Sequence, residues 1–171
     1  MSLVLITGSC GLVGSESVKF FESKGFDIIG IDNNSRLEFF GKDGDTNWIK
    51  RNLIKLHKNY IHKNVDIRNY LALEKIFKKY KNSIKLIIHS AAQPSHDWAK
   101  NEPFVDFQIN ALGTLNLLNL TKRYAYNAPF IFMSTNKVYG DNPNLLPLRE
   151  LNSRWEISKK HKYFQGIDES M

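Results

Sequence analysis

Cysteine and long apolar segments are the features that this sequence has least of. Its 171 residues include one cysteine, Cys10, so no internal disulfide can form and a disulfide scaffold is excluded. The apolar runs are far shorter than the roughly 20 residues that a membrane-spanning helix needs, and no charged segment followed by an apolar one precedes Leu3. We therefore expect a protein that spans no membrane and works in the reducing cytoplasm.

Patterns of metal ligands are also missing. The five histidines show no paired spacing of the H-E-x-x-H kind. We expect no metal site, and we interpret His89, at the end of a predicted strand, as a packed histidine.

Positive charge is concentrated in one part of the chain. Residues 50–85 hold 11 of the 24 Lys and Arg residues but only two acids, Asp66 and Glu74. Such a segment can bind nucleic acid. Here the lysines interleave with apolar residues at helical spacing, which favours solvated outer faces of helices, and no nucleic-acid-binding motif accompanies them. We expect no nucleic-acid partner.

Short apolar runs alternate with helical patterns along most of the chain. The predicted strands cover residues 3–7, 26–31, 60–66, 84–89 and 130–134, and the predicted helices cover 15–24, 48–57, 70–80 and 105–124, with a looser segment containing Gly41 and Gly44. Strands separated by helices predict an α/β fold, a doubly wound parallel sheet with helices on both faces.

The pattern decays near the carboxyl end. After Gly140 the chain is rich in loop-forming residues, including Pro143 and Pro147. We therefore predict a core over residues 1–140 and a loop-rich tail over 141–171, with three aromatic side chains as candidate anchors: Trp155, Tyr163 and Phe164.

A glycine triplet follows the first predicted strand. Gly8, Gly11 and Gly14 open the first helix, and Asp32 ends the second strand. Missing Cβ atoms let a backbone approach a pyrophosphate, which the N-terminal N–H groups of the helix attract, and the carboxylate accepts ribose hydroxyls. This unit predicts a dinucleotide site of the Rossmann type. An acid at position 32 repels a 2′-phosphate and favours NAD over NADP, while Arg36 softens that preference.

Further candidates follow the other strands. Asp66, after the third strand, is equally consistent with receiving an adenine amino group and with capping the helix that begins near Tyr70. The small pair Ala91 and Ala92, after the fourth strand, would let a cofactor lie against the backbone. Cys10, inside the glycine loop, is interpreted as a small neutral filler.

Six segments together resemble a known family. They are residues 7–14, 32–36, 66–68, 89–93 (His-Ser-Ala-Ala-Gln), 109–118 and 134–141 (Ser-Thr-Asn-Lys-Val-Tyr-Gly-Asp). In this order they are similar to the extended short-chain dehydrogenase/reductases, the sugar-nucleotide epimerases and dehydratases. The resemblance implies an NAD cofactor that removes a hydride from a sugar carbon and returns it to the opposite face.

The resemblance also implies roles for particular residues. Thr135, with Ser134 beside it, matches the residue that hydrogen-bonds the reacting hydroxyl, and Asn110 matches a supporting asparagine. The implied cofactor-binding set is Gly8, Cys10, Gly11, Leu12, Val13, Gly14, Asp32, Asn33, Ser35, Arg36, Asp66, Ile67, Ala91, Ala92, Gln93 and Lys137. Members often pair through two long helices, so the helix predicted over 105–124 is a candidate homodimer surface, unless its apolar positions all face the sheet.

One family feature is missing. No tyrosine of this sequence has a lysine four residues later, whereas the family's general base is such a tyrosine. We expect a fold that stops before the catalytic helix and the substrate domain, and a chain that is inactive alone. Within the family the chain is most similar to epimerases that act on carbon 2 of a CDP-linked hexose. A UDP-glucose 4-epimerase-like activity of the full-length protein and a catalytically incomplete NAD-binding module are the alternatives.

Overall fold

The computed structural model describes residues 2–135 and 138–171. The chain divides into two units, Met1–Met133 and Ser134–Met171. The first unit holds the parallel sheet, and the second holds a small antiparallel ribbon. We describe each unit by itself.

The first unit alternates strands and helices, as the sequence predicts. Its elements are β1 (Leu3–Thr7), α1 (Leu12–Ser23), β2 (Asp27–Ile31), α2 (Ser35–Phe40), η1 (Gly41–Gly44), α3 (Asn47–Leu56), β3 (Tyr60–Lys63), α4 (Tyr70–Tyr80), η2 (Lys81–Ser83), β4 (Ile84–His89), α5 (His96–Asn101), α6 (Pro103–Phe107), η3 (Gln108–Leu112), α7 (Gly113–Tyr124) and β5 (Phe130–Phe132).

All five strands run parallel in the order β3-β2-β1-β4-β5. Their register aligns the last residues of the strands in one row across the sheet: Lys63, Ile31, Thr7, His89 and Phe132. The loops that follow this row all leave from the same edge. In parallel sheets of this kind, ligands bind at that edge.

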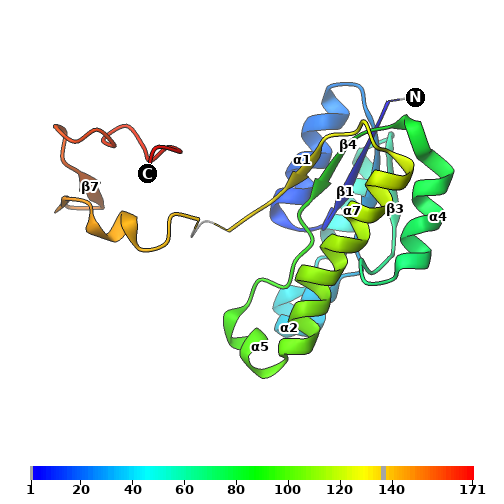
Figure 1. The fold of residues 1–171 in the computed structure, drawn as a ribbon, viewed down its shortest axis with the longest axis horizontal. Helices are drawn as coiled ribbons and strands as arrows, with labels where there is room; N and C mark the ends of the chain where they lie inside the picture. Colours follow the sequence, from blue (N-terminus) through cyan, green and yellow to red (C-terminus); the bar gives the residue numbers. More distant parts are fainter. Residues whose placement is uncertain (1, 136–137) are drawn as a thin grey trace. The chain divides into compact units, whose positions relative to one another are not determined.

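Two apolar layers cover the sheet. Alternate β1 residues point to opposite faces, so Leu3 and Leu5 pack with α4 and α7, while Val4 and Ile6 pack with α1 and α3. Figure 1 shows β1 and β4 side by side, with α1 and α4 to either side of them. The predicted doubly wound parallel sheet is confirmed.

Several predicted boundaries are wrong. β3 ends at Lys63 and β5 at Phe132, both earlier than predicted, and the segment predicted to be loose contains α2 and η1. The helix α5 was not predicted, because it is short and has no buried residue. The long helix predicted over 105–124 is present as α6, the π-helical turn η3 and α7.

The second unit, Ser134–Met171, contains η4 (Asn142–Leu145), β6 (Leu148–Glu150) and β7 (Trp155–Ile157). The last two form an antiparallel ribbon that the loop-rich prediction missed. Tyr163 is buried, as expected of an anchor, but the Trp155 side chain is 63% exposed on the ribbon. Two short strands bury little apolar surface, which leaves such a side chain uncovered.

The basic segment 50–85 is split by the fold. Its lysines lie mainly on α3 and α4, which pack on opposite faces of the sheet. The charge is therefore divided between two surfaces. Among the described residues, no helix has the length and apolar character needed to cross a membrane.

Candidate functional site

The glycine turn between β1 and α1 lies at the centre of the carboxyl edge. Gly8 has a φ of +68°, a left-handed conformation that glycine adopts without strain. A Cβ at this position would lie 2.7 Å from the Ala91 amide nitrogen, and a Cβ at Gly14 would collide with the Gly8 carbonyl oxygen. The turn therefore packs backbone against backbone. Two more predicted residues, Leu12 and Val13, are exposed in the first turn of α1.

Asp32 follows β2 and reaches the same turn. Its Oδ2 accepts a hydrogen bond from the Cys10 amide at 3.0 Å, and its Oδ1 accepts one from the Asn34 amide at 2.8 Å. Each carboxylate oxygen has a second lone pair, and the side chain is half-buried. The carboxylate is thus oriented by two backbone amides and retains acceptor capacity for a ligand hydroxyl.

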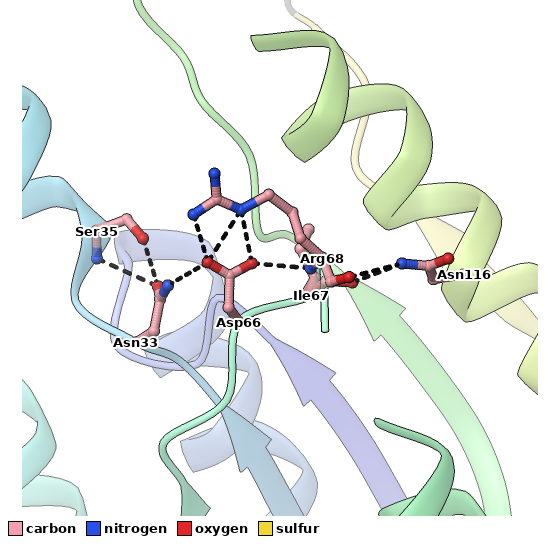
Figure 2. Close-up of polar contacts among 6 residues, drawn as sticks. All are labelled: Asn33, Ser35, Asp66, Ile67, Arg68 and Asn116. Atoms are coloured by element: carbon pink, nitrogen blue, oxygen red, sulfur yellow. Dashed lines mark hydrogen bonds and ion pairs between the residues drawn. The ribbon is translucent and has the colours of Figure 1, made fainter. Parts of the chain in front are cut away.

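The loops after β2 and β3 are joined by polar contacts, which Figure 2 shows. Asn33 Nδ2 donates to Asp66 Oδ2 at 3.0 Å, and Ser35 Oγ donates to Asn33 Oδ1 at 2.6 Å. Arg68 Nη2 donates to Asp66 Oδ2 at 2.6 Å. Hydrogen bonds from Arg68 hold the pKa of the Asp66 carboxyl below its usual range, against the opposing effect of burial.

The capping role considered for Asp66 is wrong. The helix α4 is capped by Asn69, whose Oδ1 accepts a hydrogen bond from the Ala72 amide at 3.0 Å. Asp66 instead pairs with Arg68 and bonds the loop after β2. Its neighbour Ile67 is buried, and Asn116 of α7 donates to the Ile67 carbonyl oxygen at 3.1 Å. Arg36, by contrast, is exposed, with its guanidinium 4.9 Å from the centre of the Phe40 ring.

The loop after β4 forms the other wall of the turn. Ala91 is half-buried and Ala92 is exposed. Gln93 is buried and its side chain donates to Asp106 Oδ1 at 2.9 Å. The Asn110 side chain makes two hydrogen bonds to the Gln93 backbone: it accepts one from the amide at 2.9 Å and donates one to the carbonyl oxygen at 3.0 Å. Both amide side chains therefore bind the protein itself, and Asn110 supports the loop.

His89 is almost completely buried beneath this loop, at 2% exposure. Its Nδ1 lies 2.7 Å from Thr7 Oγ1, and its Nε2 lies 2.9 Å from Thr114 Oγ1. Burial lowers the pKa of the ring to about 4, so the imidazole is neutral near pH 7. The packed histidine predicted from the sequence is confirmed.

A second buried polar cluster lies behind the glycine turn. Ser9 Oγ lies 2.9 Å from the Tyr60 hydroxyl, which lies 3.0 Å from His62 Nδ1. The Cys10 thiol is buried beside them, and burial together with the Asp32 charge raises its pKa to about 11. A thiol with a raised pKa is a poor nucleophile, which agrees with the prediction of a neutral filler.

Ser134 and Thr135, which are predicted to hydrogen-bond the reacting hydroxyl, are exposed at the start of the second unit. Lys137, a predicted cofactor-binding residue, lies outside the described residues. Among the described residues, no group of three His, Cys, Asp or Glu side chains is placed to hold a metal ion.

A cleft of about 620 Å³ adjoins the first turn of α1. Its walls include Leu12 and Ser15 of α1 and Trp48, Leu53 and Leu56 of α3. It lies on the α1 and α3 face of the sheet, beside the glycine turn.

Several residues of the site were not predicted. Thr7, Thr114 and Asn116 make buried or half-buried hydrogen bonds that join β1, β4, the Asp66 loop and α7. For Thr114 and Asn116 a signal exists in the sequence, because residues 110–116 include several small and polar side chains within the predicted helix.

Comparison with known proteins gives the following matches. The family described as NAD dependent epimerase/dehydratase matches residues 4–163. CDP-paratose 2-epimerase of Salmonella typhi is 37% identical over 138 residues, which is 81% of this chain and 38% of that protein. UDP-glucose 4-epimerase of Caenorhabditis elegans is 30% identical over 148 residues, 86% of this chain and 41% of that protein.

A solved structure, UDP-glucose 4-epimerase of Thermotoga maritima with UDP-glucose, matches with a TM-score of 0.66 and 29% identity. The match covers 85% of this chain and 42% of that one. The chain thus spans about two fifths of the length of these relatives.

Proposed function

This chain belongs to the NAD dependent epimerase/dehydratase family, and we propose that it supplies the NAD-binding half of a nucleotide-sugar epimerase. The observation that carries the proposal is the glycine turn. Gly8, with its positive φ, lies against the Ala91 backbone at one side of the turn, and Asp32 lies at the other. Family membership agrees with the NAD cofactor that the sequence predicts.

The residues present fit NAD. Gly8, Gly11 and the first turn of α1 would receive the pyrophosphate, because a helix N-terminus presents free N–H groups to an anion. Asp32 would accept hydrogen bonds from the adenosine ribose. Asp66 and Ile67 would lie beside the adenine, and Ala91 and Ala92 would line the wall formed by the β4 loop. NAD supplies a hydride acceptor and donor in such enzymes.

For the chain's part in the reaction, we assign Thr135 and Ser134 to hydrogen bonds with the reacting hydroxyl. Asn110 supports the β4 loop through the Gln93 backbone. The sequence contains no tyrosine with a lysine four residues later. General base catalysis contributes about 10²- to 10⁴-fold to a rate, so we expect this chain alone to bind NAD without turning over a sugar nucleotide.

Titration calorimetry with NAD and NADP tests the cofactor assignment. Asp32→Asn removes the charge at the carboxyl end of β2, and Asp27→Asn, at the amino end of the same strand, is the matched control. Loss of a hydrogen bond to a charged group corresponds to about 10- to 100-fold. We expect that loss of NAD affinity for Asp32→Asn and no change for Asp27→Asn. The wild-type chain should bind NADP more weakly than NAD. Equal effects of the two variants would overturn the assignment.

For the substrate, we infer a CDP-linked hexose acted on at carbon 2, as in CDP-paratose 2-epimerase. The identity of 37% to that enzyme supports this choice over UDP-glucose, although UDP-glucose 4-epimerases also match at about 30%. The protein as its gene encodes it should be incubated with CDP-paratose and with UDP-glucose. Conversion of UDP-glucose alone would exclude the CDP-hexose assignment.

An apolar stripe on α6 and α7 supports a homodimer. Phe104, Phe107, Leu115 and Leu118 are exposed at helical spacing, although other apolar positions of α7 face the sheet. We expect Leu115→Glu to shift a dimer to monomer in sedimentation velocity, and Leu71→Glu, on exposed α4 surface, to leave it unchanged. A wild-type monomer would rule this surface out.

A further inference from the structure

The hydroxyl of Thr114 determines the direction of a buried hydrogen-bond chain. Thr114 Oγ1 donates to the Asn110 carbonyl oxygen at 2.6 Å. A hydroxyl has a single proton, so the 2.9 Å contact between Thr114 Oγ1 and His89 Nε2 requires the histidine to donate. The imidazole is therefore protonated on Nε2.

The other ring nitrogen follows from this. A neutral imidazole protonated on Nε2 has an acceptor at Nδ1, so Thr7 Oγ1 donates to it across 2.7 Å. The lone pairs of the same hydroxyl remain for the Ala91 amide, which donates to Thr7 Oγ1 at 3.3 Å. The hydrogen bonds therefore all point in one direction, with each group donating to the next from the β4 loop, through His89, to η3.

Asn110 links the two ends of this hydrogen-bond chain. The side chain of Asn110 holds both backbone groups of Gln93, two residues after Ala91. The short loop between β4 and α5 is consequently held at Ala91 by Thr7 and at Gln93 by Asn110, and both ends lead to the His89 ring. Thr7 and His89 are register partners in neighbouring strands, so the ring sits on a rigid part of the sheet.

We propose that His89 is a positioning residue, which holds the loop Ser90–Gln93 at the distance from Gly8 that the dinucleotide needs. The inference rests on the proposed NAD-binding function. A Cβ on Gly8 would lie only 2.7 Å from the Ala91 nitrogen, so the loop packs directly against the pyrophosphate turn. A displacement of the loop therefore changes the wall of that turn. His89 acts through Thr7 and Thr114, and it exchanges no proton with a ligand.

Two variants in one helix separate this role from general packing. Thr114→Val removes the hydroxyl that links His89 to η3. Thr121→Val is the matched control, because Thr121 Oγ1 donates to the Leu117 carbonyl oxygen at 2.7 Å in the same i to i−4 manner, two turns farther along α7 and away from His89. Thr114→Ser keeps the hydroxyl and should restore the wild-type behaviour.

The readout is amide hydrogen exchange at Ala91 and Gln93, measured by NMR together with the ¹⁵N spectrum of the His89 ring. We expect the wild-type ring to show a protonated Nε2 and an unprotonated Nδ1. Thr114→Val should speed exchange at both amides by about 10-fold, the change that corresponds to one buried hydrogen bond, and Thr121→Val should leave both unchanged.

Affinity for NAD should fall by about 3- to 10-fold in Thr114→Val, again the range for one hydrogen bond. A ring protonated on Nδ1, or equal exchange in Thr114→Val and Thr121→Val, would overturn the positioning role. If wild-type protein bound no NAD, the proposed function would fail while the exchange and ring data still decided the role of His89. Should Thr114→Val fail to fold, the wild-type ring spectrum still tests the proposal, because a ring protonated on Nδ1 would overturn it.

Discussion

The two sides of the sheet's carboxyl edge hold their polar side chains in different ways. Beside β2 and β3, the side chains of Asp66 and Arg68 pair while 26% and 32% exposed. Beside β4, His89 is 2% exposed, and its neighbours Thr7 and Thr114 satisfy both ring nitrogens. The first network is partly exposed to solvent and ions, and we call it the open side; the second is buried, and we call it the closed side.

This difference has an energetic consequence. Exposed ion pairs contribute little because water and salt screen them. A buried polar group that loses its partner is left without water, which costs about 1–3 kcal/mol. We therefore expect the Asp66 side to govern ligand selection with little effect on stability, and the His89 side to govern both stability and the shape of the site.

The largest effect is expected where the two sides meet, at Gly8. Gly8→Ala places a Cβ against the Ala91 backbone, whereas Gly25→Ala, at a φ of +85°, has nothing within 4 Å. Both substitutions carry the left-handed strain of about 1–2 kcal/mol, and Gly8→Ala adds a backbone clash. Urea denaturation should show a greater loss of stability for Gly8→Ala, and calorimetry should show loss of NAD binding for that variant alone. Equal stability losses would contradict the packing described for the turn.

Acid should destabilise the closed side first. The pKa of His89 is lowered to about 4, below the usual value of 6.5. Between these two pH values the ring is protonated in the unfolded state and neutral in the folded state. Stability should fall as the pH drops from 6.5 toward 4, by up to about 3 kcal/mol from this residue. His89→Gln should reduce that slope in urea denaturation measured across this pH range. His62, whose pKa burial also lowers, is present in both proteins and cancels in the comparison. An unchanged slope would refute the assignment to His89.

The smallest effect is expected from Asp66→Asn on the open side. The pKa of Asp66 is lowered, so its contribution to stability is present above about pH 3.8 and disappears only as the pH falls through the lowered value. Near pH 7 the variant should lose at most about 1 kcal/mol of stability, and less at high salt. Denaturation at two salt concentrations checks this. A loss that exceeds that of Thr114→Val would reverse the comparison of the two sides.

Local patterns in the sequence predicted the strands and the cofactor turn. Alternating apolar runs identified all five parallel strands of the first unit, and Gly8, Gly14 and Asp32 identified the turn, because glycine spacing and a strand-end acid are local requirements. The Asp66 alternatives were left open for the opposite reason. The sequence offered an adenine contact or a helix cap for Asp66, and only the structure shows that Asn69, directly before α4, is the cap while the Asp66 carboxylate pairs with Arg68.

The partners of His89 show the same limit. The sequence predicted a packed histidine, but Thr7 and Thr114 are 82 and 25 residues away from it, and only the sheet register and the packing of α7 bring them together. Trp155 was expected to anchor the carboxyl-terminal segment and is exposed, because burial depends on how much of the chain covers a side chain.

The sequence by itself determined the doubly wound fold, the dinucleotide turn and the family, since apolar period and glycine spacing act within a few residues. The single cysteine, Cys10, excludes a disulfide scaffold, and in the structure its free thiol is buried in that turn. The tertiary structure alone decided which polar side chains meet and in which direction their hydrogen bonds run. Those choices depend on contacts between distant segments, and such contacts exist only once the sheet has set its register.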